Sequence, residues 1–291
     1  MILFMMVTTA RSTAYTRMAL ASFLAHTPLG PDDRVILIDN DGAAAPPANG
    51  RVELVRNRWP MGFAANVNQV LEWARGSAAD LVVLNNDIIF TPGWLPPLLV
   101  DDRAILLPMT NQHVEYHVGD VVFPAFLDLD GYLGREGELR AAARQHAATW
   151  AEAAVFRPLH LSFHAFRLSH TVLTTLGPFD EHFGPAGGED GDYRIRAHLA
   201  GFDVRCAPTS FVLHFGGRST WRSGEADSER DAREATMLAR FRAKWGDDLT
   251  ELFLHGPGAN AVLSRHGLTE AVAVDNVKKV IETCLMRRCR G

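Results

Sequence analysis

Uninterrupted apolar runs alternate along the chain with polar loops, and these runs predict buried strands. Residues 81–84 are all apolar and are followed at once by the polar triplet 85–87. Since apolar and polar residues do not alternate within the run, we expect a strand buried on both faces, as in a parallel sheet covered by helices. Residues 2–7 and 35–38 have the same character. The pattern therefore predicts an α/β fold.

Segments with helical spacing separate or follow these runs, which is the alternation typical of βαβ units. They cover residues 14–25, a segment that ends near 76, residues 138–148 and residues 229–245. Further strands are expected at 52–55, 202–206 and 210–213, with a bend at Pro208, and residues 98–107 fit a helix followed by a strand. Residues 249–254 and 269–286 predict additional helices.

Polar side chains stand at the carboxyl ends of two predicted strands. Asp39 ends one strand, and Asn85, Asn86 and Asp87 end another. In open α/β sheets, ligands bind beyond these strand ends. A carboxylate there can hold Mg²⁺ or Mn²⁺, or accept hydrogen bonds from a nucleoside. The same residue types also favour simple turns, so both interpretations stay open for these residues alone.

Small residues line the loop that leads into the second predicted helix. Gly62 and the alanines after it would let the backbone approach a ligand closely, and a helix N-terminus favours phosphate. Asn57 and Asn66 are candidate nucleotide contacts here, or ordinary cap and turn residues.

A Gly-Gly turn at residues 187–188 begins a helix that is predicted to end at Gly201. Glu189 and Asp190 fall in the first turn, where the helix macrodipole favours carboxylates in their ionised form. This purely structural effect explains one acidic residue in the first turn, but it does not explain the whole sequence motif that surrounds the residue.

Taken in order, these motifs resemble those of the family 2 inverting glycosyltransferases of the GT-A fold. The resemblance covers roughly residues 2–246 and rests on a first strand ending in Thr-Thr, "DNDG" at 39–42, "GFAANVN" at 62–68, "LNND" at 84–87 and "GGED" at 187–190. It implies a Rossmann-like nucleotide-binding mixed sheet flanked by helices. Residues 1–108 would be the nucleotide-sugar-binding half, 109–222 the acceptor-binding and catalytic half, and 247–291 a C-terminal helical extension.

The resemblance also implies roles on the donor side of the site. By position, Asp39 matches the residue that binds the nucleobase, with Thr8, Thr9 and Asn66 lining the nucleotide pocket. A carboxylate can accept the imide N–H of uracil or thymine, which favours a UDP- or dTDP-linked donor and leaves GDP-sugars open.

The metal and catalytic residues follow from the same resemblance. Asn85, Asn86 and Asp87 match the Asp-x-Asp motif that binds metal and diphosphate, although Asn85 removes one negative charge. His214 matches a late histidine that completes the coordination of Mg²⁺ or Mn²⁺. The "ED" pair supplies the catalytic base, which we expect to be Asp190, with Glu189 orienting the acceptor or donor sugar.

The implied activity is inverting transfer of a sugar to a hydroxyl group of a glycan, a lipid-linked glycan or a small molecule. The "LNND" and "GGED" motifs are most similar to those of bacterial rhamnosyltransferase-type members. Residues 221–222 are Trp-Arg, but the Gln-x-x-Arg-Trp signature of processive members is missing, so we expect a non-processive enzyme.

The net charge and the composition limit the classes of partner that we expect for this chain. A net charge of −5 gives no electrostatic footprint for nucleic acid. The odd number of cysteines, three, forms no zinc spacing or disulfide framework, which fits a reducing cytosol, and Cys284 and Cys289 are expected to be idle thiols. Residues 1–7 are too short to span a bilayer. An arginine cluster at 287–290 allows at most peripheral membrane contact.

Two other classes remain as alternatives. A sugar-1-phosphate nucleotidyltransferase would need a Gly-rich phosphate loop with a downstream lysine, and residues 8–13 contain neither glycine nor lysine. A non-catalytic glycan-binding relative is suggested by Asn85. Hydrolysis of a donor in the presence of metal would separate it from an active enzyme.

Overall fold

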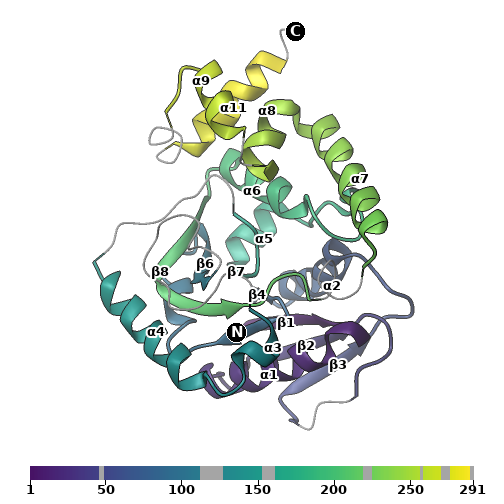
Figure 1. Ribbon diagram of the computed structural model, residues 1–291, viewed down its shortest axis with the longest axis vertical. Coiled ribbons are helices and arrows are strands. Elements are labelled where there is room, and N and C mark those ends of the chain that lie inside the picture. The colour runs from purple at the N-terminus through teal and green to yellow at the C-terminus, as the bar shows by residue number, and fades with distance from the viewer. Residues whose placement is uncertain are drawn as a thin grey trace.

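The structure of the protein is a computed structural model, in which the apolar runs form the strands of a single mixed sheet (Figure 1). The structure describes residues 1–45, 49–111, 127–152, 161–218, 225–255, 258–269 and 276–288. The strand order is β3-β2-β1-β4-β7-β6-β8-β5. The strands are β1 Ile2–Thr8, β2 Arg34–Asp39, β3 Val52–Arg56, β4 Asp80–Leu84, β5 Ile88–Phe90, β6 Ala104–Thr110, β7 Ala165–Leu168 and β8 Asp203–His214.

The first half of the sheet is parallel and the second half is mixed. Strands β3, β2, β1 and β4 run side by side in one direction. β7 lies antiparallel between β4 and β6, and β5 runs antiparallel to β8 at the edge. The expected α/β sheet is therefore confirmed, with its carboxyl ends on one side of the molecule.

Helices cover both faces of the sheet. The helices outside the C-terminal region are α1 Thr13–His26, α2 Phe63–Gly76, α3 Leu129–Tyr132, α4 Glu136–Thr149, α5 His170–Leu176 and α6 Glu189–Leu199. In β1, Leu3 and Met5 join the core beneath α2, while Phe4 and Met6 join the core beneath α1. Successive side chains of a strand point to opposite faces, so an apolar run without alternation fills both cores.

One strand prediction differs from the structure, and the edge strand β5 was not predicted. β5 covers residues 88–90 and pairs with β8. Residues 202–206 and 210–213 belong to one strand, β8, with a shift in its register against β6 between Pro108 and Met109. The irregularity includes Pro208, whose missing N–H cannot join a ladder, and a bulge absorbs it without ending the strand.

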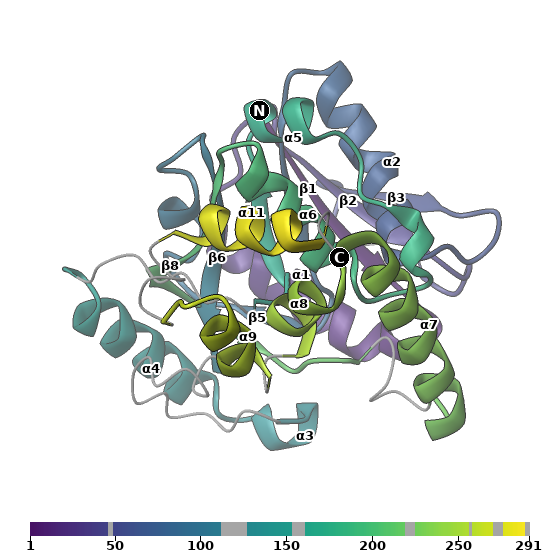
Figure 2. The same ribbon diagram turned by 90° about the horizontal axis from the view of Figure 1, so that it is seen from above.

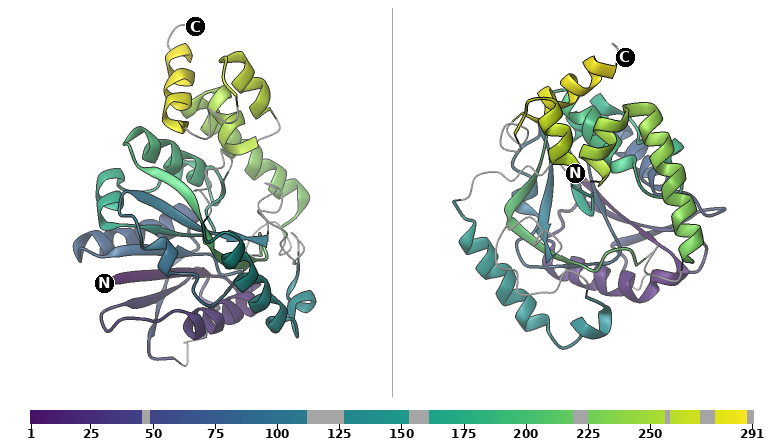
Figure 3. Two further views of the ribbon diagram at one scale, coloured as in Figure 1. Left: turned by 90° about the vertical axis from the view of Figure 1, so that its left-hand side faces the viewer. Right: turned by 45° about the horizontal axis from the view of Figure 1, so that its top comes forward.

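The C-terminal helices lie together at one end of the molecule, next to α6 (Figure 2 and Figure 3). They are α7 Asp227–Trp245, α8 Asp247–Thr250, a π-helical turn Glu251–His255, α9 Ala259–Arg265 and α11 Val277–Arg288. Their apolar side chains form a third core with Ile195 of α6. Helix α9 was not predicted from the sequence. In the described part of the chain, no helix combines the length and apolarity that crossing a membrane requires.

A buried carboxylate fastens α6 to the end of α7. Asp192 is fully buried and accepts hydrogen bonds from Arg196 Nε at 2.8 Å and Trp245 Nε1 at 2.9 Å. Lys244 Nζ lies 2.5 Å from Oδ1, the oxygen that also accepts the Trp245 hydrogen bond. Three donors on one carboxylate offset the cost of burying its charge.

Replacing this carboxylate should loosen the joint between α6 and α7. We expect Asp192→Ala to lower the free energy of unfolding by about 2–3 kcal/mol, because it leaves the N–H of the half-buried Trp245 without its acceptor and removes one anionic partner from Arg196 and Lys244. Urea denaturation at one pH measures the effect. Asp247→Ala is the matched control, since it removes an exposed pair with Arg242 and should change little. Equal losses in the two variants would contradict this account.

Candidate functional site

A cavity of about 860 Å³ opens at the carboxyl ends of the strands. That volume suits a ligand of the size of a nucleotide-sugar, because small-molecule pockets span roughly 300–1,000 Å³. The predicted site residues on its wall are Thr9, Gly62, Asn66, Asn85, Asn86, Asp87, Glu189, Asp190 and His214. Thr8, Asp39 and Asn57 lie behind the wall.

Strand pairing brings Asp87 and His214 together from distant parts of the sequence. The short strand β5 pairs with β8 in a register that sets Ile88 opposite His214. The Phe215 N–H donates to the carbonyl oxygen of Asp87 at 2.9 Å, which continues the pairing to the cavity edge. Asp87 Oδ1 then lies 3.2 Å from His214 Nε2.

The surroundings of Asp87 favour its ionised form. Burial alone would raise the pKa of this carboxyl group, but the charge and hydrogen bond of His214 outweigh burial and lower the pKa below its ordinary value. The backbone N–H of Arg218 adds a hydrogen bond to Oδ2 at 3.1 Å. A carboxylate held ionised at a cavity edge is suited to a cation.

The donor set at this edge fits a hard divalent cation. Asp87 offers a carboxylate oxygen, and His214 would offer Nε2, 3.2 Å away, once the ion has displaced the proton between them. Two adjacent ligands of an octahedral ion with bonds of about 2.1 Å stand roughly 3 Å apart, close to the separation found here. The Asn85 amide nitrogen Nδ2 lies 3.4 Å from His214 Nε2, and a half-turn of the amide would exchange it for the neutral oxygen. These three residues would hold Mg²⁺ or Mn²⁺.

Asn86 and Thr8 serve the scaffold of the site. The Asn86 amide donates to Ser12 Oγ at 2.7 Å and to Thr16 Oγ1 at 3.2 Å. Thr8 Oγ1 shares a hydrogen bond of 2.8 Å with Thr16. Both contacts hold the start of α1 against the strand ends, so Thr9 rather than Thr8 faces the cavity.

Asp39 is buried beneath its own loop. Its carboxylate accepts hydrogen bonds from the backbone N–H groups of Ala43 and Ala44 at 3.1 and 3.2 Å. Arg56 Nε forms an ion pair with it at 3.2 Å. Contact with a nucleobase would require the backbone at 43–44 to give up these bonds.

Asparagines shape the loop that forms one wall of the cavity. The Asn57 amide donates to Asn40 Oδ1 at 2.8 Å and to Asn66 Oδ1 at 2.7 Å. Asn66 in turn donates to the carbonyl oxygens of Met61 and Gly62. The side chains of Asn57 and Asn66 are therefore engaged in fixing the loop, a role that leaves its backbone to meet a ligand.

Gly62 allows this loop to touch the segment that precedes α6. A Cβ atom at position 62 would come within 2.9 Å of the Gly184 carbonyl oxygen. The next residue, Phe63, donates its N–H to the Pro185 carbonyl at 2.8 Å. The loop before α2 and the loop before α6 thus form one continuous wall.

The start of α6 presents two acidic side chains to the cavity. Gly187 and Gly188 take positive φ angles of 100° and 85°, which turn the chain sharply into the helix at Glu189 as predicted. Asp190 Oδ2 accepts the Phe163 N–H at 2.9 Å. Its Oδ1 is buried and has no hydrogen-bond partner. One oxygen is thus fixed, whereas the other has no partner and is shielded from solvent.

The helix N-terminus is not the dominant influence on the pKa values of this pair, which are raised and not lowered. Burial is the largest effect on Asp190 and, together with the neighbouring charge of Glu189, holds the pKa of Asp190 well above its ordinary value. Burial likewise raises the pKa of Glu189, despite backbone hydrogen bonds and Arg233 nearby. Desolvation of a carboxylate outweighs the macrodipole, whose effect is only about 0.3–1 kcal/mol at exposed sites.

Sequence patterns missed several residues of the site. The Phe163 N–H, which fixes Asp190, and Arg218, which bonds Asp87 through its amide, carry no local motif. For Arg218, the sequence feature that could have indicated a site residue is the Gly-Gly pair at 216–217 directly before it. The prediction concerning residues 221–222 lies outside the described residues.

Comparison with known proteins agrees with this geometry. The sequence profile described as glycosyl transferase family 2 matches residues 5–100. Comparison with the curated proteins gives no match at the sequence level. Among solved structures, GalNAc-T7 with UDP, GalNAc and Mn²⁺ aligns at a TM-score of 0.56 and 16% identity, covering 97% of this chain and 54% of that chain.

Two further structures align over most of their own length. TarS from S. aureus has a TM-score of 0.50 at 11% identity, with 97% of this chain and 90% of that chain covered. Mannosyltransferase PcManGT from Pyrobaculum calidifontis, in complex with GDP-Man and Mn²⁺, has a TM-score of 0.49 at 12% identity, with 98% and 86% covered. At such identities the likeness concerns the fold. The sequence match to glycosyl transferase family 2 thus covers residues 5–100, and the fold of the whole chain is that of the GT-A glycosyltransferases.

Proposed function

We propose that this protein is a non-processive, inverting glycosyltransferase that uses a nucleoside-diphosphate sugar. One observation carries the proposal: Asp87, His214 and Asp190 line the same cavity, and Asp190 keeps one buried oxygen without a hydrogen-bond partner in the protein. A cation-binding edge and a base in one pocket meet the two needs of sugar transfer, which are a place for the diphosphate and a proton acceptor for the attacking hydroxyl.

Asp190 is the proposed general base. Inversion by a single displacement requires a group that takes the acceptor hydroxyl's proton while its oxygen attacks from the face opposite the diphosphate. The Phe163 N–H holds one Asp190 oxygen, and the other, unpartnered but shielded from solvent, would have to be uncovered to take the hydroxyl's proton. A pKa raised by burial makes a carboxylate a stronger base, provided that it is ionised when the acceptor arrives. Glu189 would orient the acceptor or donor sugar.

Asp192 competes less well for this role. Its carboxylate is fully buried and is occupied by Arg196, Lys244 and Trp245. None of its contacts faces the cavity, and its removal should act on stability.

The donor side is proposed to bind a UDP- or dTDP-linked sugar. Bound Mg²⁺ or Mn²⁺, held by Asp87 and His214 with Asn85 beside them, would neutralise charge developing on the departing diphosphate. Thr9, Gly62 and Asn66 line the nucleotide region of the cavity. Residues 109–222 are proposed to shape the acceptor side, where a hydroxyl of a glycan, a lipid-linked glycan or a small molecule would bind.

The first test concerns the base. General-base catalysis typically contributes ~10²–10⁴-fold, so Asp190→Asn should lower turnover by about that factor while donor binding survives. In the wild type, kcat/KM should fall on the acid side at a pH above the ordinary carboxyl value of about 4, because protonated Asp190 cannot accept the hydroxyl proton. This acid limb should vanish from the residual activity of the variant.

A fold control accompanies this test. Because the folded pKa of Asp190 is raised, ionisation opposes folding as pH rises above the ordinary carboxyl value, and the neutral amide that Asp190→Asn introduces escapes this loss. The variant should therefore melt no lower than the wild type at neutral pH. Near-normal turnover in Asp190→Asn, with an inactive Glu189→Gln, would move the base to Glu189.

The second test concerns the cation. Calorimetry should show tighter UDP binding with Mn²⁺ than without it in the wild type, and no such gain in Asp87→Ala. His214→Ala should lose most of the same gain, and the double variant should lose no more than Asp87→Ala, because both side chains serve one ion. Equal affinities with and without Mn²⁺ in the wild type would refute the cation site.

The third test concerns Asp39. If its carboxylate receives the base's imide N–H, Asp39→Ala should weaken UDP binding by about 10–100-fold, the value of one charged hydrogen bond. CDP, whose base lacks that N–H, should bind weakly to the wild type and change little in the variant. Asp32→Ala, an exposed carboxylate before the same strand, is the matched control. Unchanged UDP affinity in Asp39→Ala would leave this residue with only its loop contacts.

A further inference from the structure

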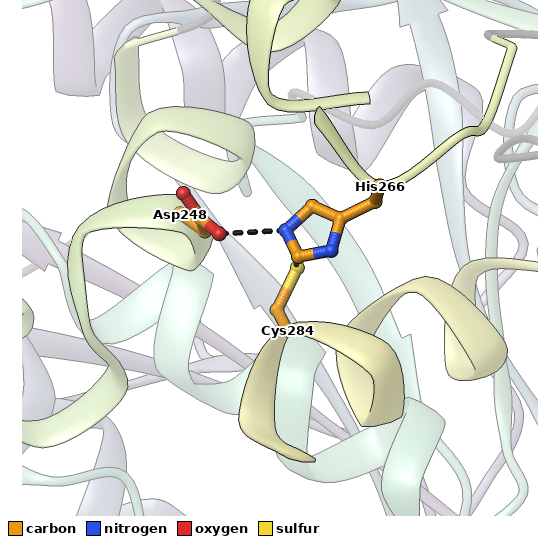
Figure 4. Close-up of side chains that lie close together, drawn as sticks. All are labelled: Asp248, His266 and Cys284. Atoms are coloured by element: carbon orange, nitrogen blue, oxygen red, sulfur yellow. Dashed lines mark hydrogen bonds and ion pairs between the residues drawn. The ribbon is translucent and has the colours of Figure 1, made fainter. Parts of the chain in front are cut away.

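Three side chains from separate C-terminal segments converge on one point away from the cavity (Figure 4). Asp248 lies in α8, His266 caps the end of α9, and Cys284 lies in α11. His266 Nε2 is 2.6 Å from Asp248 Oδ2 and 3.6 Å from Cys284 Sγ. All three potential ligand atoms lie within 4.8 Å of one another.

Both neighbours of His266 face the same ring nitrogen. In a nucleophilic triad, the acid and the thiol would contact opposite ring nitrogens, so that the imidazole passes a proton between them. Here Nε2 meets both of them, while Nδ1 is buried without a partner. One N–H cannot point well at two acceptors, whereas a cation between the three atoms would be bound by all of them.

The environment is that of a built site. The His266 side chain is 1% exposed and Cys284 is buried. Arg265 Nη2 donates to Asp248 Oδ1 at 2.8 Å, and this contact turns Oδ2 toward the histidine. Outer contacts of this kind orient metal ligands. Asp248 keeps 28% of its side chain exposed, which leaves an entry path and room for a water ligand.

We propose that Asp248, His266 and Cys284 bind Zn²⁺ or a cation of similar softness. The mixed sulfur, nitrogen and oxygen set suits zinc, and it differs from the oxygen-rich sets preferred by Mg²⁺. Tetrahedral zinc with its usual bond lengths separates N and S by about 3.6 Å and N and O by about 3.4 Å. The first value matches the distance found, and Asp248 would withdraw by about 0.8 Å to reach the second.

Binding exchanges protons for the ion. Cys284 must lose its thiol proton to become a thiolate ligand, and the proton shared between Asp248 and His266 Nε2 leaves as well. Water completes the fourth position on the side of Asp248. The ion then joins α8, α9 and α11, of which α11 packs against α6. Cys284, expected from the sequence to be an idle thiol, becomes the ligand that sets the metal preference.

The site can be tested with Co²⁺ and Zn²⁺ on the full chain. One equivalent of Co²⁺ should give a thiolate-to-cobalt charge-transfer band, and Zn²⁺ should abolish it by displacement. The pair Asp87–His214 contains no thiol, so the band reports the C-terminal site alone. A hundredfold excess of Zn²⁺ over its Kd should raise Tm by about 5 °C, and this gain should persist in Asp87→Ala.

Variants decide between this site and a simple hydrogen-bonded cluster. Cys284→Ser should lose the band, Asp248→Asn and His266→Gln should weaken it, and Cys206→Ser, a buried thiol in β8, should keep it. If Cys284→Ser does not fold, the wild-type band and its displacement by Zn²⁺ still decide the question together with His266→Gln. No band in the wild type, or a band that survives in Cys284→Ser, would overturn the proposal.

Discussion

The pairing of β5 with β8 is the constraint on which the site depends. It joins only a few residues of each strand, yet it sets the end of β4 beside the end of β8 and gives Asp87 its partner. A slip of one residue would turn His214 to the opposite face of the sheet and leave the buried Asp87 carboxylate without its main compensation. The electrostatics of the cavity edge are therefore a consequence of strand register.

Local patterns were sufficient for the parts of the fold that local patterns determine. The runs at 2–7 and 81–84 are buried strands, and the Gly-Gly turn places Glu189 and Asp190 in the first turn of α6. Each of these features follows from periodicity or from backbone conformations that glycine permits. The sequence also predicted that polar residues at strand ends would share one edge.

Contacts between distant segments could not be read in this way. Nothing near residue 88 indicates that its strand pairs with residues of β8, and nothing near Asp39 indicates that two amides of the following loop cover it. The same holds for His266, whose neighbours come from two other helices. In every case the missing information is tertiary, and it decides whether a polar group faces a ligand or the protein.

Helix α6 shows a further consequence of its position between two cores. Tyr193 and Ala197 pack into the core of the sheet, while Ile195 packs against the C-terminal helices. In the described chain, Leu249, Leu252 and Val280 are buried in the same core as Ile195. A shortened form of the protein that ends after α7 would lose most of this core and expose the Ile195 side of the helix that carries Asp190. Such a truncation would replace a buried core with an exposed apolar patch, which favours aggregation.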